Sequence, residues 1–148
     1  MAEYVYNPVQ VVQANQPVIL EDSIPCNKGC VYHRNQSGNF ILRGITPNCF
    51  ARYQVTFNGN IAVPTGGTVG EISVALAVDG EPILTSNAIV TPAAVEEYFN
   101  VTSTAIITVP RGCCFSVSVE NTTAGTTPAD VGTAINVQNA NLVVSRIA

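Results

Sequence analysis

The stretch Ala51-Arg-Tyr-Gln-Val-Thr-Phe-Asn-Gly-Asn-Ile-Ala-Val63 alternates apolar and polar side chains and decides the class of fold. The large apolar side chains that fall on one face of this stretch, if it is extended, are Tyr53, Val55 and Phe57. The polar residues between them fall on the opposite face. A period of two residues is typical of a half-buried strand in an antiparallel sheet.

The same alternation recurs along the chain, and turn signals separate the repeats. The other alternating stretches are residues 72–79, 99–109, 115–120 and 142–147. Asn-Gly at 58–59, Asp-Gly at 79–80 and Pro-Arg-Gly at 110–112 are typical of tight turns. No stretch has a convincing helical period. The sequence therefore predicts an all-β fold, an antiparallel jelly-roll sandwich of about 8–10 strands in one domain over residues 1–148.

The composition excludes several classes of protein. Of the 148 residues, 47% are hydrophobic and 11% charged, against about 25% charged in an average domain. Such a chain is not disordered, and it holds no run of 18 apolar residues that could span a membrane. Six basic against ten acidic residues argue against a nucleic-acid partner. A surface with so little charge favours self-association.

The chain has five cysteines, and this number indicates whether it folds in an oxidising or a reducing compartment. They are Cys26, Cys30, Cys49, Cys113 and Cys114. An odd number argues against a full disulfide framework, and the N-terminal residues have neither a basic start nor an apolar core like that of a secretion signal. We therefore expect a chain made in a reducing cytoplasm, with no signal peptide; the resemblance described below implies that this cytoplasm is bacterial.

One group of residues has the composition of a zinc site: Cys26, Cys30, His33 and Cys49. In the alternative interpretation Cys49 is a small buried residue, while Cys26 and Cys30 share one loop, either reduced or bridged. We favour this alternative and expect neither a metal nor another cofactor.

Candidates for catalysis are few. His33 is the only histidine, and no serine lies in a Gly-x-Ser-x-Gly turn. Glu96 and Glu97 are neighbours, so on a strand they point to opposite faces, and Asp79 and Glu81 flank a turn glycine. We therefore expect a protein that is not an enzyme.

The N-terminal residues 1–8 have two interpretations. Tyr4 and Tyr6 fall on one face of an extended chain and could anchor a docking arm, since rigid aromatic side chains often anchor interfaces. The same residues could equally be the first strand of the sandwich.

Several stretches carry a resemblance to a known family. They are residues 51–63, Gly70 to Ile83 with its Val-Asp-Gly-Glu-Pro hairpin, the Pro-Arg-Gly turn, and the closing Asn141-Leu-Val-Val-Ser-Arg-Ile147. Together these resemble the tumour-necrosis-factor-like jelly rolls, which include the complement globular heads. They are especially similar to the bacterial branch found at exosporium glycoprotein tips and on phage virions. The resemblance covers residues 38–148.

The resemblance implies an assembly and a role. Such domains form compact homotrimers that bury aromatic side chains of one sheet near the three-fold axis. The candidates for that interface are Tyr53, Phe57, Phe99 and Phe115, of which some must fill the sandwich core instead. The implied role is a structural protein on a virion surface, decorating a bacteriophage capsid by contact with the major capsid protein or another virion component. The alternative is a carbohydrate- or receptor-binding fibre tip, with a host-surface glycan bound by the loop from Thr122 to Gly132.

Overall fold

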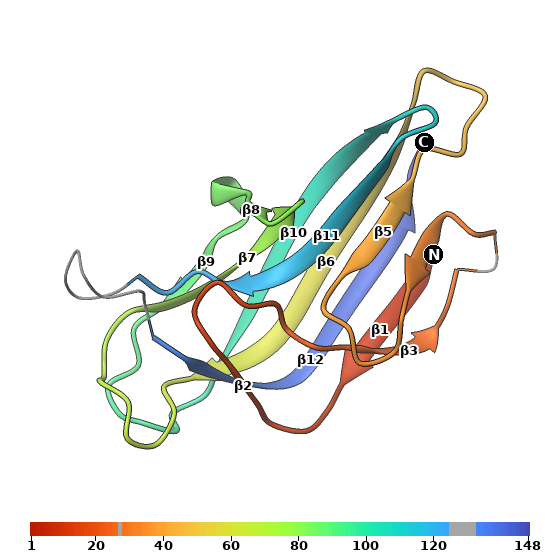
Figure 1. The fold of residues 1–148 in the computed structure, drawn as a ribbon. Helices are drawn as coiled ribbons and strands as arrows, with labels where there is room; N and C mark the ends of the chain where they lie inside the picture. The colour runs from red at the N-terminus through yellow and green to blue at the C-terminus, as the bar shows by residue number, and fades with distance from the viewer. Residues whose placement is uncertain (27, 125–132) are drawn as a thin grey trace.

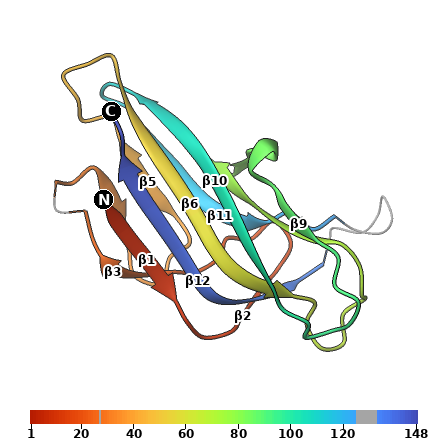
Figure 2. The same ribbon diagram turned by 180° about the vertical axis from the view of Figure 1, so that it is seen from behind.

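The computed structural model describes residues 1–26, 28–124 and 133–148. In these residues the chain forms two antiparallel sheets packed face to face, as Figures 1 and 2 show from opposite sides. The prediction of an all-β jelly-roll sandwich is confirmed.

The first sheet, called sheet A below, contains the longest strands. In spatial order these are β10 (Phe99–Pro110), β6 (Phe50–Ala62), β12 (Ile135–Arg146), β1 (Ala2–Tyr6) and β3 (Glu21–Ile24), with β2 (Gln10–Val12) paired to β12. Burial alternates along β10 and β6, as the period of two predicts. Each strand therefore gives one row of side chains to the core and one row to the outer face, which Figure 2 views.

The second sheet, sheet B, packs on the apolar side of sheet A. Its order is β4 (Val31–His33), β5 (Phe40–Arg43), β11 (Cys114–Asn121), β7 (Ile72–Val78) and β8 (Glu81–Pro82), with β9 (Ala88–Val90) paired to β7. A single 3₁₀ turn, Leu84–Ser86, follows β8. The described residues contain twelve strands, more than sequence predicts, because β2, β8 and β9 have only two or three residues each.

The core between the sheets is closed. Its largest fully buried side chains include Tyr4, Tyr53, Phe40, Phe57, Leu42, Ile61, Leu76 and Leu142. Burial of one such side chain contributes about 1.5–3 kcal/mol to folding, so this face of sheet A has to point inward. Among the described residues, no helix has the length and apolar character needed to cross a bilayer.

Both chain termini lie at the same end of the sandwich (Figures 1 and 2). The loops at this end join β3 to β4, β5 to β6 and β10 to β11; they contain Cys26, Cys30, Cys49 and Cys113, and Cys114 begins β11. We call this the terminal end.

Candidate functional site: the outer face of sheet A

The outer face of sheet A is built from uncharged polar side chains on three neighbouring strands. They alternate with the core residues and are Asn100, Thr102 and Thr104 on β10, Gln54, Thr56, Asn58 and Asn60 on β6, and Gln138, Asn141 and Ser145 on β12. The strand register places them in rows across the sheet, for example Thr102, Asn58 and Asn141. Ile106, 63% exposed, opposes Gln54 in the same face.

Polar groups on this face hydrogen-bond to one another. The hydroxyls of Thr56 and Thr104 are 3.0 Å apart, and Thr102 donates to the Asn58 side-chain oxygen at 3.2 Å. Burying a polar group is costly mainly when it loses its partner. Because these groups already have partners within the sheet, another protein surface can cover them at low cost.

Charged side chains lie at the margins of the face. The Arg52 guanidinium sits over the Phe50 ring, 4.7 Å from its centre, at the start of β6. On β1 the Glu3 carboxylate accepts a hydrogen bond of 2.6 Å from the Asn141 amide. Protein interfaces typically have few charged residues at the centre and more at the rim.

Comparisons with known proteins address the fold. No family model matches the sequence, and no curated protein matches it. Among solved structures, the globular domain of the zebrafish complement 1qA protein is similar, with a TM-score of 0.60 and 14% identity over 99% of this chain and 97% of that one. The Eiger TNF of S. frugiperda has a TM-score of 0.65 and 12% identity, over 99% and 92%. Murine APRIL has a TM-score of 0.56 and 11% identity, over 93% and 98%.

The chain has the tumour-necrosis-factor-like jelly-roll fold. The resemblance predicted from sequence is thereby confirmed as a likeness of fold. In this fold, the two sheets and the strand order of sheet A place the polar rows described above on one continuous outer surface.

Two predicted trimer contacts need correction. Tyr53 and Phe57 have no exposed surface, because they point between the sheets rather than out of sheet A. The period of two is correct, but the strongly apolar face of β6 fills the core, and its polar face is the one available to a partner. Phe115 is partly buried against the same core, whereas Phe99 is 40% exposed at the start of the edge strand β10.

The interpretation of residues 1–8 as a docking arm is also wrong, and the alternative, a first strand of the sandwich, is correct. Residues 2–6 form β1, which lies between β12 and β3. Tyr4 is 1% exposed, and Tyr6 packs against the edge of the core. These tyrosines hold the first strand in the sandwich.

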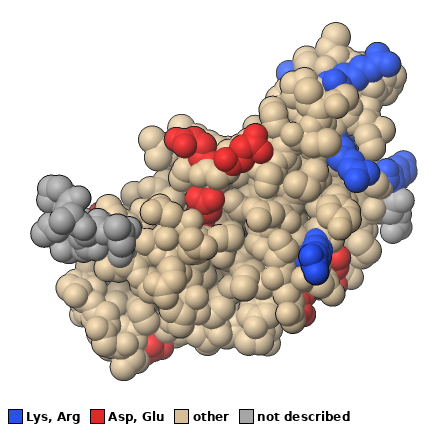
Figure 3. Space-filling view, viewed as in Figure 1, with Lys and Arg blue, Asp and Glu red and all other residues tan. Residues whose placement is uncertain are grey.

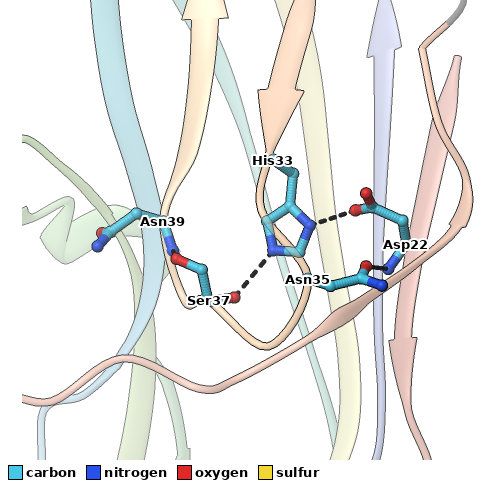
Figure 4. A network of polar contacts seen from close by, with 5 residues as sticks. All are labelled: Asp22, His33, Asn35, Ser37 and Asn39. Atoms are coloured by element: carbon cyan, nitrogen blue, oxygen red, sulfur yellow. Dashed lines mark hydrogen bonds and ion pairs between the residues drawn. The ribbon is translucent and has the colours of Figure 1, made fainter.

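Both ring nitrogens of His33 have polar partners within the protein (Figure 4). Nδ1 contacts the carboxylate of Asp22, and Nε2 lies 2.9 Å from the carbonyl oxygen of Ser37. The ring stacks on Phe40, with centres 4.3 Å apart. His33 therefore has no nitrogen free for a metal, and it ties β3 to the turn between β4 and β5.

The zinc hypothesis also fails for the cysteines. Cys49 is exposed on the β5–β6 loop, as are Cys113 and Cys114 at the β10–β11 turn, whereas Cys30 is buried. Within the described parts of the chain, no three His, Cys, Asp or Glu side chains are grouped to hold a metal ion. Cys26 and Cys30 share one loop, as the alternative interpretation expects, but its expectation of a buried Cys49 is wrong because that residue lies on an exposed loop.

The acidic pairs have structural partners that the sequence alone does not reveal. Glu96 accepts hydrogen bonds from the backbone and hydroxyl of Thr65 and from the Asn136 amide. The bonds from Thr65 hold the pKa of Glu96 below its usual value. Glu97 accepts from two backbone N–H groups in its own turn, and Asp79 accepts from the Ser116 N–H at 3.0 Å. Each carboxylate thus fixes a loop.

The fibre-tip alternative relies on the loop from Thr122 to Gly132. Most of this loop, residues 125–132, lies outside the described residues. Thr122 and Thr123, which are described, hydrogen-bond back to Ser73 on β7.

Proposed function

We propose that the chain is a non-enzymatic structural protein that assembles as a homotrimer through the outer face of sheet A and decorates the surface of a bacteriophage capsid or similar particle. One observation carries the proposal: a continuous face of three long strands presents uncharged side chains, and several of their polar groups are paired with one another.

The size of this face suits an interface between copies. Strands lie about 4.8 Å apart and rise about 3.3 Å per residue, so the three strands, each of about twelve residues, cover about 600 Å². Stable interfaces bury about 800 Å² per partner. The edge strand β10, where Phe99 is exposed, adds to this area.

The rest of the surface supports a role in a particle. On the side that Figure 3 views, basic and acidic groups occupy small separate areas, and most of the surface is uncharged. A shell protein needs an inert exterior once its assembly face is covered. The capsid partner follows from the sequence resemblance, and we expect the major capsid protein or another virion component to bind outside the trimer interface.

The two parts of this proposal, the assembly and the virion role, are tested separately. Light scattering of the full chain at micromolar concentration is expected to give the mass of three copies, and a stable monomer would overturn the assembly. Genes for portal, maturation protease and major capsid protein next to the coding gene would support the virion role. A purified capsid from that genome that fails to bind the protein would contradict it.

A further inference from the structure

Two cysteines at the terminal end, Cys26 and Cys30, line one pocket. The loop between β3 and β4 turns so that the Gly29 N–H approaches the Cys26 carbonyl at 3.4 Å, and Gly29 adopts a φ of +67° that glycine tolerates well. Cys30 follows this turn directly, so both cysteines lie on one short loop segment and line the same pocket.

The two thiols differ in access. Cys30 is 6% exposed and belongs to the core cluster, and the Tyr53 hydroxyl donates to its carbonyl at 3.2 Å. Cys26 is only partly buried. Both line an open pocket of about 590 Å³ together with Met1, Lys28 and Arg146. One thiol therefore faces solvent at a pocket, and the other lies fixed behind it.

The surroundings favour a thiolate at Cys26. Partial burial raises the pKa of its thiol, but hydrogen bonds from the Lys28 backbone and the Cys30 side chain outweigh burial and bring the pKa to about 7. Lys28 and Arg146 add positive charge to the pocket, and Figure 3 shows Lys and Arg side chains gathered toward this end. A thiolate is the attacking species in exchange with disulfides.

We propose that Cys26 and Cys30 are a redox-active dithiol, with Cys26 the attacking and Cys30 the resolving thiol, whose substrates are low-molecular-weight disulfides. The Cys26 thiolate attacks the external disulfide, whose S–S bond breaks, and one external thiol leaves. Cys30 then loses its proton and attacks the Cys26 sulfur, which releases the second external thiol. Two protein thiols are oxidised to one disulfide, and one external disulfide is reduced to two thiols.

The test uses the full chain with C49S, C113S and C114S, which leaves only this pair of cysteines. With excess oxidised glutathione, intact mass is expected to show the loss of two hydrogens with no persistent adduct. Adding C30S should leave one stable glutathione on Cys26. With C26S in its place, Cys30 should react about ten-fold or more slowly, because its thiol is buried and hard for an external disulfide to reach. Equal rates for these two variants, or adducts on both cysteines without closure, would overturn the proposal.

Peptide mapping of the unsubstituted chain gives a readout that needs no variant. Trypsin cleaves after Lys28, so a bond between Cys26 and Cys30 links the peptides Met1–Lys28 and Gly29–Arg34. The linked pair should form on oxidation and disappear on reduction. Finding both peptides alkylated and unlinked after oxidation would contradict the assignment.

Discussion

The hydroxyl groups of Thr56 and Thr104 lie 3.0 Å apart, on neighbouring strands of sheet A. The Thr104 hydroxyl also donates to the Val55 carbonyl at 3.1 Å, so the Thr56 hydroxyl is the donor between the two. Both groups are thus paired within one protomer. A second copy can therefore cover this part of the face without leaving either hydroxyl donor unpaired.

An added carboxylate should lower the stability of the protomer when it is placed in the core, and should weaken assembly when it is placed on the outer face of sheet A. Phe115→Asp places a carboxylate against the core and should lower the free energy of unfolding by about 3 kcal/mol. Ile106→Asp adds the same group to an exposed site on the outer face, so the protomer should keep its strand content while the assembled mass falls. Urea titration and light scattering measure the two effects. A folded Phe115→Asp monomer would instead place Phe115 at the axis.

Gly44 should tolerate no side chain. A Cβ there would overlap the carbonyl oxygen of Pro110, because the β5–β6 loop runs against the β10–β11 turn and bonds to it through the Cys113 carbonyl at 2.8 Å. Gly44→Ala should therefore cost about 2 kcal/mol or more in the free energy of unfolding. Gly70→Ala, where a Cβ meets nothing within 4 Å, is the matched control. Equal stabilities of the two variants would show that the loops do not pack as described.

The Glu96 carboxylate should make stability depend on acid pH. Its pKa is lower in the folded protein, chiefly through the hydrogen bonds from Thr65. Its contribution is therefore complete above the unfolded pKa of about 4.3. It is lost as pH falls through the lower folded pKa. The difference in unfolding free energy between wild type and Glu96→Gln should shrink from pH 7 to pH 3, as measured by urea titration.

A control for this pH dependence is Glu71→Gln, at an exposed carboxylate for which the described residues give no side-chain hydrogen bond. Its difference from wild type should stay constant over the same pH range. A constant difference for Glu96→Gln as well would mean that Thr65 does not hold the ionised carboxylate.

The alternation of apolar and polar residues along single strands predicts the fold, because a strand that buries one face must carry apolar side chains at every second position. It identifies the two faces of β6 correctly, but it cannot say which face meets the other sheet and which meets a partner. Tyr53 and Phe57 illustrate this: large aromatic side chains suit an interface as well as a core, and only the packing of sheet B on their side decides between the two.

Contacts between distant segments are what the sequence could not predict. His33 and Asp22 meet because β3 and β4 belong to different sheets that approach at one edge, and no spacing rule links them. The adjacency of Cys26 and Cys30 follows from a short turn, so their shared loop was predictable. The burial of Cys30 behind Cys26 depends on the core formed by strands far along the chain.

The most direct test of the assembly face compares two matched substitutions by sedimentation equilibrium. Asn58→Lys adds a charge at the centre of the outer face, next to Thr102, whereas Asn39→Lys adds the same charge at an exposed loop before β5. The account predicts a folded monomer for Asn58→Lys and three-copy mass for Asn39→Lys and wild type. A three-copy mass for Asn58→Lys at equal concentration would contradict it.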